Sequence, residues 1–407
     1  MSFFSFLKKP KEELAVIVEI GSGSVSGTLV LLSENTKPRI FYSTRRQITF
    51  KNDLAMPHLE SLMLKTVQDV VNVVKKDGLA HLNFTRLTKR TINKVFLVVS
   101  APWCLTQTKI VEIKRDYFFD LTKKILNDLI QTQVDVAENS VKESFAKFED
   151  GIQDIETIEK KIIQFKVNGY LVNDVLDKEV KDFETTILVS SMPTNILEKL
   201  KSIISQNLSS RSSILVNSFT LTFFTIFRDM FPEKENYLLL DLSSELTTVS
   251  VVRDQIVMDN VSFPMGRNMF VRQLAKDLNV SIEEAFSLLA AYHQKNLDPI
   301  YENKIEISLE GAMKIWNVSL HKALEKFSQE RYIPRSIVKI TNDDFGYFFA
   351  KKLSNERFTQ LGFSEEPFNV IIVDAKKFKD CCSLSSDMII DSFTYINSLF
   401  LNKITNL

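Results

Sequence analysis

Two apolar runs that each end at a carboxylate constrain this chain more than any other feature. LAVIVEI carries Glu19 at its end and is followed by GSGSVSG and a second apolar run, TLVLLS. YLLLDL carries Asp241 at its end, and the polar turn 243–245 leads into the β-branched run LTTVSVV. Both patterns predict a strand, a turn and a strand. A carboxylate beside outward-pointing turn N–H groups suits a metal-bound phosphate, and an ordinary hairpin with a solvent-facing acid is the alternative.

Composition limits the classes of protein that the chain can belong to. A chain of 407 residues is too long for one compact core and predicts two or more subdomains. The 51 basic and 51 acidic side chains give no overall attraction to nucleic acid, so we expect no nucleic-acid partner. Three cysteines do not suit a disulfide framework and indicate a cytoplasmic setting. The start does not match a signal peptide and no apolar run is long enough to span a membrane, so we expect a soluble or peripheral protein.

The pattern of predicted strands and helices in the first half of the chain changes near Trp103. Before it, strands around the first hairpin precede an amphipathic helix over 59–76 and the buried strand VFLVVSAP. After it, a strand, a helix over 121–130, a hairpin turning at Asn168-Gly169 and the strand TTILVSS form an α+β unit. The two flanking strands should lie close together, so the pattern predicts one domain interrupted by another.

The second half continues the alternation of helices and strands. Helices are predicted over 196–208, 219–231, 282–295, 309–328 and 388–404, with Ser281 as the N-cap of the third. Strands are predicted at SSILVNS, around the second hairpin including IVMDNVSF, at RSIVKIT and at FNVIIVDA. A further helix begins at PMGRN, and another, YFFAKKL, follows the polar turn NDDFG.

Three segments leave their roles open. Residues 1–11 place Phe3, Phe4, Phe6 and Leu7 ahead of three lysines and suit a membrane surface, a partner groove or a frayed tail. The basic patch of Arg86, Lys89, Arg90 and Lys94 suits a solvated loop or a binding surface. The final helix, 388–404, suits core packing, with an amphipathic membrane foot as the alternative.

The order of these features resembles the actin-like ATPase superfamily, and more narrowly its FtsA and PilM branch of bacterial cell-division and type IV pilus proteins. The resemblance extends from Leu14 to about Asn402. DLSSELTTVSVV resembles the branch's second phosphate motif, D-I-G-A-E-L-T-N-I, and the first hairpin resembles the first phosphate motif. The unit around Asn168-Gly169-Tyr170 resembles the SHS2-type subdomain of this branch. The implied fold class is α/β, a two-lobed actin-like (ribonuclease H-like) fold with an inserted α+β subdomain.

The resemblance implies boundaries for each part of the chain. Residues 1–13 would be an N-terminal tail, and 95–191 the inserted subdomain. Lobe I would comprise 14–94 and 192–235. Lobe II would comprise 236–280 and 335–407, with 281–334 as its helical subdomain.

The resemblance also implies ATP and Mg²⁺ in a cleft between the lobes. One side of the phosphates would face Glu19, Gly21, Ser22 and Gly23, and the other side would face Asp241, Ser243, Glu245 and Thr247. Gly266 and Asn268 would stand at the helix entry, and Thr341 to Gly346 would lie under the nucleoside. The metal would contact Glu19 and Asp241, and no catalytic residue is assigned.

Several positions depart from the family pattern, and most of these departures would weaken nucleotide binding. Glu19 stands where the family has Asp, and Ser243 replaces a glycine, which places a Cβ where backbone should approach phosphate. Arg267 replaces the second glycine of the P-x-G-G-N entry, although it could also contact a phosphate. TNDDFG replaces a run of glycines and brings two carboxylates near a triphosphate. These departures predict weakened or lost nucleotide binding and little hydrolysis.

The leading hypothesis is therefore a scaffold that docks cytoplasmic tails of membrane proteins of the division or pilus machinery. It would lie in the cytoplasm, peripheral to the inner membrane, and could self-associate through the inserted subdomain. The close approach of the last helix to FNVIIVDA favours PilM, whereas length and the inserted subdomain favour FtsA. The alternative is an active Mg-ATP-dependent ATPase. A sugar- or acetate-kinase relative would need a catalytic carboxylate and an acceptor site, which no segment supplies.

Overall fold

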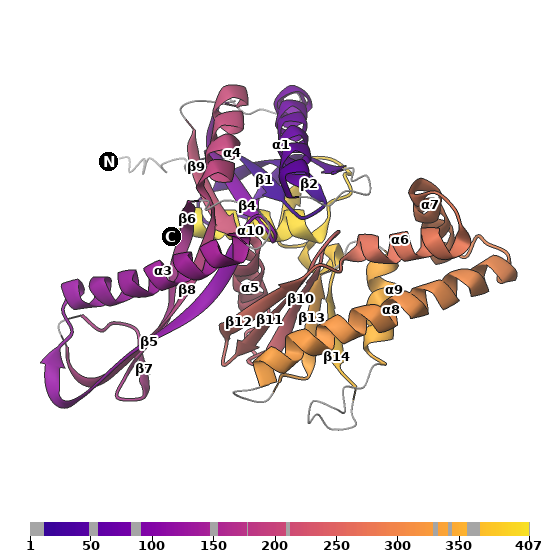
Figure 1. The fold of residues 1–407 in the computed structure, drawn as a ribbon. Coiled ribbons are helices and arrows are strands. Elements are labelled where there is room, and N and C mark those ends of the chain that lie inside the picture. Colours follow the sequence, from indigo (N-terminus) through magenta and orange to yellow (C-terminus); the bar gives the residue numbers. More distant parts are fainter. Residues whose placement is uncertain are drawn as a thin grey trace, which may run out of the picture.

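The computed structural model describes residues 12–48, 56–82, 91–146, 154–176, 178–208, 212–328, 333–340, 344–355 and 367–406. Residues 1–11, three members of the basic patch (Arg86, Lys89 and Arg90) and Thr341 lie outside these ranges, so the roles suggested for them stay predictions. The described chain forms three sheets, and Figure 1 shows them as an upper lobe, a lower right lobe and an arm at the lower left.

Lobe I is built on a six-stranded sheet in the order β15-β3-β2-β1-β4-β9. Its strands are β1 (Glu12–Ile20), β2 (Ser24–Ser33), β3 (Arg39–Gln47), β4 (Ile92–Val99), β9 (Ser213–Ser218) and β15 (Ser383–Leu384). The first hairpin pairs β1 with β2 antiparallel, while β4 lies parallel to β1. The central strands are apolar on both faces because helices cover both sides. Ala15 and Ile17 belong to one core cluster, and Val16 and Val18 belong to the other.

Lobe II is built on a five-stranded sheet in the order β12-β11-β10-β13-β14. Its strands are β10 (Tyr237–Leu242), β11 (Thr247–Arg253), β12 (Ile256–Phe263), β13 (Ser336–Ile340) and β14 (Asn369–Val373). Leu238 and Leu240 face a core shared with the helices of this lobe. Tyr237 and Leu239 face the opposite way, into the core that also contains Ala15 of lobe I. The two lobes therefore share one hydrophobic layer.

The inserted subdomain is a four-stranded sheet in the order β5-β8-β6-β7, with one helix packed on it. Its elements are β5 (Leu105–Asp120), α3 (Lys123–Ala146), β6 (Ile155–Val167), β7 (Tyr170–Val172) and β8 (Glu179–Pro193). Asn168 and Gly169 have φ angles of 51° and 82°, which is the left-handed pair that a two-residue hairpin turn requires.

The remaining helices cover the two larger sheets. They are α1 (Met56–Val73), η1 (Val74–Gly78), α2 (Leu79–His81), α4 (Thr194–Asn207), α5 (Phe219–Met230), α6 (Arg267–Leu278), α7 (Ile282–His293), α8 (Pro299–Ser328), α9 (Asp344–Leu353), η4 (Ala375–Phe378) and α10 (Ser392–Thr405). Ser281 caps α7 as expected, because its side chain accepts a hydrogen bond from the Glu284 N–H. Among the described helices, none combines the length and the apolar character needed to cross a bilayer.

The structure differs from the expected boundaries in three places. Strand β4, expected at the start of the insert, is hydrogen-bonded between β1 and β9, as its apolar faces require. Helix α10 and strand β15, expected in lobe II, pack on lobe I. Phe400 of α10 stacks on Phe96 of β4, which places this helix in the core and not at a membrane. Helix α8 begins at Pro299, ten residues before the expected Leu309.

Candidate functional site

The tips of the two carboxylate-tipped hairpins meet between the lobes. The Ser22 Oγ lies 2.9 Å from the Ser243 Oγ. The same Ser22 oxygen accepts a hydrogen bond from the Glu245 N–H at 3.0 Å. Ser22 is buried and its two partners are partly buried, so these hydrogen bonds are partly shielded from water. The loops that would flank a phosphate are therefore hydrogen-bonded directly to each other. We refer to Ser22, Ser243 and Glu245 together as the latch.

A small cavity lies behind the latch and collects most of the predicted site residues. It measures about 170 Å³, whereas pockets for small molecules typically measure roughly 300–1,000 Å³. The predicted residues that line it are Glu19, Gly21, Ser22, Gly23, Asp241, Ser243 and Gly346. Sequence reasoning did not place Arg45, Lys339 or Asp391 in this lining, and all three are charged.

Glu19 is held by an arginine from the third strand of the sheet. Strand pairing aligns Glu19 with Ser26 and Ser26 with Arg45, so the three residues form a row across β1, β2 and β3. Ser26 Oγ donates to Glu19 Oε2 at 2.9 Å, and Arg45 contacts the same oxygen at 2.5 Å. Arg45 also donates to Asp391 at 2.8 Å. Burial raises the pKa of Asp391, but the Arg45 charge and the hydrogen bonds from Thr394 and Arg45 together outweigh it, and the net pKa is lowered.

Asp241 faces Glu19 from the other lobe and has a different environment. Its Oδ1 is buried and has no hydrogen-bond partner among the residues that the structure describes. Burial, followed by the negative charge of Glu19, raises the Asp241 pKa to about 7, although Lys339 and Arg45 oppose the shift. Near neutral pH a large share of Asp241 side chains is therefore protonated.

The N-terminus of α6 is occupied by protein groups. Backbone N–H groups at a helix start can bind an anion. Here the N–H of Arg267 donates to the Ser243 carbonyl at 2.9 Å, and that of Asn268 donates to the Ser244 carbonyl at 2.8 Å. Gly266 allows this approach, because a Cβ there would lie 2.4 Å from the Ser244 oxygen.

Glu245 and Thr247 have partners of their own and do not line the small cavity. The Glu245 carboxylate accepts hydrogen bonds from Asn268 and Arg272 at 2.7 and 2.8 Å. Thr247 is fully buried and bonds to Met265 and Trp316. Asn342 and Asp343, predicted to crowd the nucleoside site, lie outside the described residues.

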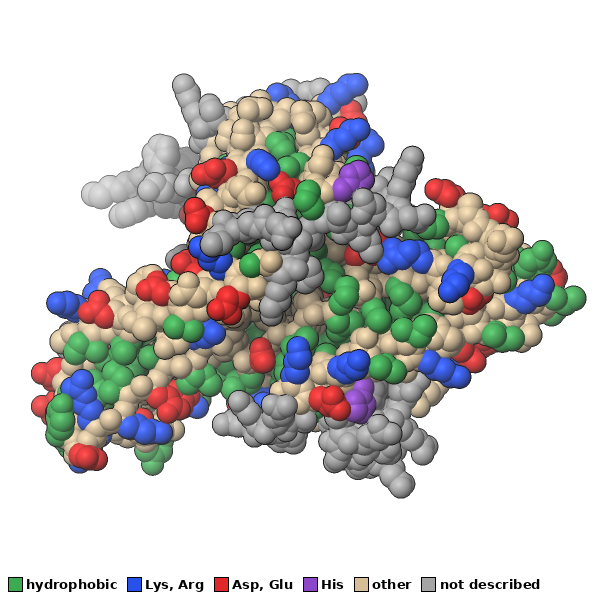
Figure 2. All heavy atoms as spheres, in the orientation of Figure 1, with side chains coloured by type: hydrophobic (Ala, Val, Ile, Leu, Met, Phe, Trp, Pro, Cys, Tyr) green, Lys and Arg blue, Asp and Glu red, His purple; other side chains and the backbone are tan. Residues whose placement is uncertain are grey.

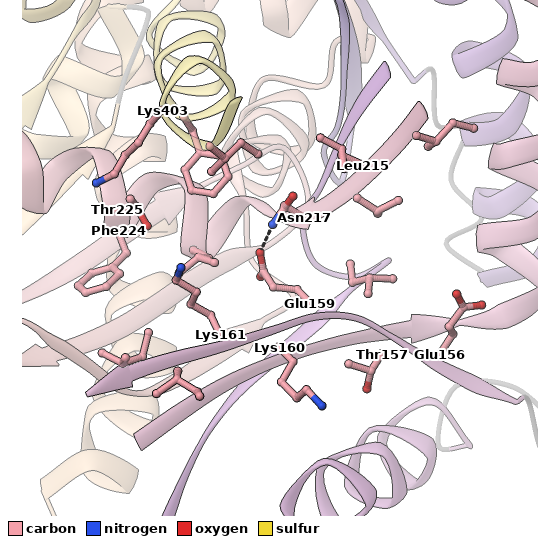
Figure 3. Close-up of a pocket in the computed structure, with 18 of the residues that line it drawn as sticks. Glu156, Thr157, Glu159, Lys160, Lys161, Leu215, Asn217, Phe224, Thr225 and Lys403 are labelled. Carbon is pink, nitrogen blue, oxygen red and sulfur yellow. Dashed lines mark hydrogen bonds between the residues drawn. The ribbon is translucent and has the colours of Figure 1, made fainter. Parts of the chain in front are cut away.

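A second hollow lies where the insert meets lobe I, and sequence reasoning did not identify it (Figure 3). It measures about 580 Å³ and is lined by consecutive residues of two strands, 156–163 of β6 and 214–217 of β9. Strand β9 is an edge strand of its sheet. Strand β7 pairs only with the end of β6, so among the described strands residues 155–164 of β6 are paired through the backbone with β8 alone. We call this hollow the β6/β9 groove.

The β6/β9 groove has a buried carboxylate at its centre. Glu159 of β6 accepts hydrogen bonds from Ser190 Oγ at 2.8 Å and Ser218 Oγ at 2.7 Å, and also from Asn217. Burial raises the Glu159 pKa, although these hydrogen bonds oppose the shift. Glu159 therefore ties the insert to lobe I.

The charged side chains at the rim of the β6/β9 groove are mainly basic. Lys201 pairs with Glu156, and Lys403 pairs with Asp229. Lys161 and Arg228 form no ion pair with another described residue, and Arg228 lies over the Phe224 ring. Figure 3 shows Lys161 directed into the groove and Lys160 directed away from it. The groove therefore carries excess positive charge.

Comparisons with known proteins identify the fold. No family model matches the chain, and no curated protein matches its sequence. A structure described as the PilM-PilN type IV pilus biogenesis complex is similar at a TM-score of 0.63 and 11% identity, covering 97% of this chain and 98% of that chain. MreB 5 of Spiroplasma citri bound to AMPPNP gives a TM-score of 0.46 at 8% identity, covering 97% and 98% of the two chains. The chain has the two-lobed actin-like fold that the sequence predicts.

Proposed function

We propose that this chain is a PilM-like actin-fold scaffold that binds a peptide segment of a membrane-associated partner and no longer uses ATP. It would lie at the cytoplasmic face of the inner membrane. The likeness to a PilM-PilN complex supports a role in pilus assembly over the division role that the sequence left open.

The direct contact between the hairpin tips is the observation that carries the loss of ATP use. A triphosphate between these hairpins would have to break the contact between Ser22 and Ser243, which are 2.9 Å apart. It would also compete with the Ser243 and Ser244 carbonyls for the N–H groups of α6. The cavity of about 170 Å³ behind the latch is too small for a nucleotide.

The carboxylates do not suit Mg²⁺ either. The metal takes oxygen ligands in a near-octahedral arrangement. Glu19 already binds Arg45 and Ser26, and the raised pKa of Asp241 makes it a poor ligand near neutral pH. We therefore assign no metal-dependent step to this chain.

The β6/β9 groove suits an extended peptide. A strand edge without a strand partner can add a further strand through its backbone groups, while neighbouring side chains select the sequence. The outer edge of β9 and the first part of β6 provide such edges. Lys161 and Arg228 favour a peptide that carries acidic side chains.

Thermal unfolding with nucleotide tests the loss of ATP use. A ligand present at a hundred times its Kd stabilises the folded state by about 2.7 kcal/mol. We expect the Tm with millimolar Mg-ATP to equal the Tm with Mg²⁺ alone. An increase of several degrees with Mg-ATP, absent with Mg²⁺ alone, would instead support the active ATPase.

A peptide array separates the scaffold from the remaining alternatives. The array would carry the cytoplasmic tails of membrane proteins from the organism that encodes this chain. We expect wild-type protein to bind a small set of acidic, extended tails. Binding to no tail would remove the scaffold role while leaving the result on ATP intact.

A further inference from the structure

Helix α8 exposes a row of aliphatic side chains along its outer side. Its inner face is buried, with Ile305, Leu309 and Trp316 in the core of lobe II. On the outer face Ile300 is 69%, Ile307 62%, Ile315 46% and Val318 55% exposed. Single exposed apolar residues are normal on a surface, but four large aliphatic side chains on one face of one helix indicate an interaction site.

The row runs straight along the helix axis. With 3.6 residues per turn, Ile300, Ile307 and Val318 fall on one line that passes over Gly311, Ile315 lies about 60° to one side, and the 18 residue steps from Ile300 to Val318 span about 27 Å. A helix partner would instead require a repeat of seven residues. That repeat leads from Ile300 and Ile307 to Lys314 and His321, which are not apolar. The row therefore suits a flat surface better than a second helix.

Lysines accompany this aliphatic row. Lys304, Lys314 and Lys322 lie on the same exposed face, as helical spacing places them beside it. Three of the four carboxylates of α8 have partners, because Glu306 and Glu310 bind Lys352 of α9 and Glu325 lies beside His321. The fourth, Glu302, is partly buried in the first turn. Neither Lys314 nor Lys322 forms an ion pair with another described residue. Figure 2 shows hydrophobic and basic side chains together along this part of the molecule, at the lower right.

We propose that the outer face of α8 binds the surface of an anionic lipid bilayer. Aliphatic side chains would enter the boundary between headgroups and acyl chains, and the lysines would contact anionic headgroups. A second copy of the chain fits less well, because an isologous contact would bring the same lysines together. The proposal does not depend on peptide binding in the β6/β9 groove, and it gives the scaffold a fixed orientation at the membrane.

Vesicle flotation with the full chain tests this surface. One set of vesicles contains phosphatidylcholine alone, and the other contains about one third phosphatidylglycerol. We expect flotation only with the anionic vesicles and a decrease as salt is raised. Replacing one lysine, as in Lys314→Gln, should reduce the affinity about fivefold. The double variant Ile307→Ser with Val318→Ser should abolish flotation, while its far-UV circular dichroism stays unchanged.

Matched variants elsewhere separate α8 from other surfaces. Tyr170→Ser with Leu171→Ser removes two side chains that are 77% and 68% exposed at the tip of the insert. Lys75→Gln with Lys76→Gln removes two exposed lysines of lobe I. Both control variants should float like the wild type. The proposal is overturned if the wild type does not float, or if the α8 variants float equally well. It is also overturned if sedimentation shows a wild-type dimer that the α8 variants abolish.

Discussion

Ser22 and Ser243 are separated by 221 positions in the sequence, yet their hydroxyl oxygens lie 2.9 Å apart at the tips of two similar hairpins. Each hairpin comes from a different lobe, so this contact joins the lobes at the point where the family resemblance would place the phosphates. A hydroxyl in this position holds the cleft closed, whereas a glycine would leave space between the tips.

Removing the Ser22 hydroxyl should destabilise the fold. Ser22→Ala loses the contact with Ser243 and leaves the Glu245 N–H without its acceptor. A buried donor left unpaired costs about 1–3 kcal/mol. Urea unfolding should show this loss. The control is Ser205→Ala, whose exposed hydroxyl donates only to its own helix. Equal stability of the two variants would show that the latch contributes nothing.

The ionisation of Asp241 should make stability fall as pH rises. Its pKa is about 7 in the folded protein and near 3.8 in the unfolded chain, so the folded state binds the extra proton between these values. The contribution is fully present below pH 4 and is lost as pH rises through 7. Asp241→Asn mimics the protonated side chain and should raise stability at pH 8 by roughly 2–4 kcal/mol.

The pH dependence of that difference distinguishes ionisation from packing. At pH 5 Asp241 is protonated in the folded protein but still largely ionised in the unfolded chain, so the difference in the free energy of unfolding between Asp241→Asn and wild type should shrink to about 1.6 kcal/mol, the equivalent of the 1.2 units between pH 5 and 3.8. Asp387→Asn changes an exposed carboxylate and should have no effect at either pH. A constant difference between Asp241→Asn and wild type from pH 5 to pH 8 would mean that Asp241 does not titrate in this range.

The sequence could predict both hairpins because each depends on local patterns. An apolar strand ending at Glu19 or Asp241, a polar turn and a β-branched strand are visible within about fifteen residues. The turn at Asn168-Gly169 was predictable for the same reason. Ser281 capped its helix as expected.

What the sequence could not predict depends on contacts between distant segments. Arg45 reaches Glu19 only because the register of β2 and β3 places it in the same row, and Asp391 arrives from the last part of the chain. The return of α10 to lobe I depends on its packing against Phe96. The β6/β9 groove exists only once the insert packs on an edge strand, and no sequence motif marks it.

Arg45 should be the cation on which the first hairpin depends. Arg45→Ala leaves Glu19, which is buried, and Asp391 without their common partner. Removing one member of a buried ion pair typically costs about 3–5 kcal/mol. Chemical denaturation measures this cost. Arg46→Ala, at the exposed neighbouring position, is the matched control and should change stability by less than about 0.5 kcal/mol.

Reversing one charge in the β6/β9 groove should weaken binding of an acidic tail at least tenfold. Lys161 points into the groove, so Lys161→Glu would place a carboxylate against the peptide. We expect at least a tenfold loss of affinity for any tail that the array identifies, measured by fluorescence anisotropy.

Lys160→Glu makes the same charge change on the adjacent residue, whose side chain points away from the groove. It should weaken binding much less than Lys161→Glu. Equal losses would indicate long-range electrostatic attraction without a specific groove contact. Unchanged binding by both variants would place the peptide elsewhere.

Two glycines should respond in opposite directions to the same substitution. In Gly266→Ala the new Cβ would lie 2.4 and 2.5 Å from the carbonyl oxygens of Ser244 and Ser243. Both neighbours are backbone atoms that also accept hydrogen bonds from the start of α6, so the turn would have to move and those bonds would break. In Gly311→Ala the Cβ meets nothing within 4 Å, in the middle of α8. Alanine is better than glycine inside a helix by about 1 kcal/mol. Thermal unfolding should therefore show a lower Tm for Gly266→Ala and a slightly higher Tm for Gly311→Ala. If Gly266→Ala is as stable as the wild type, α6 does not pack against the second hairpin.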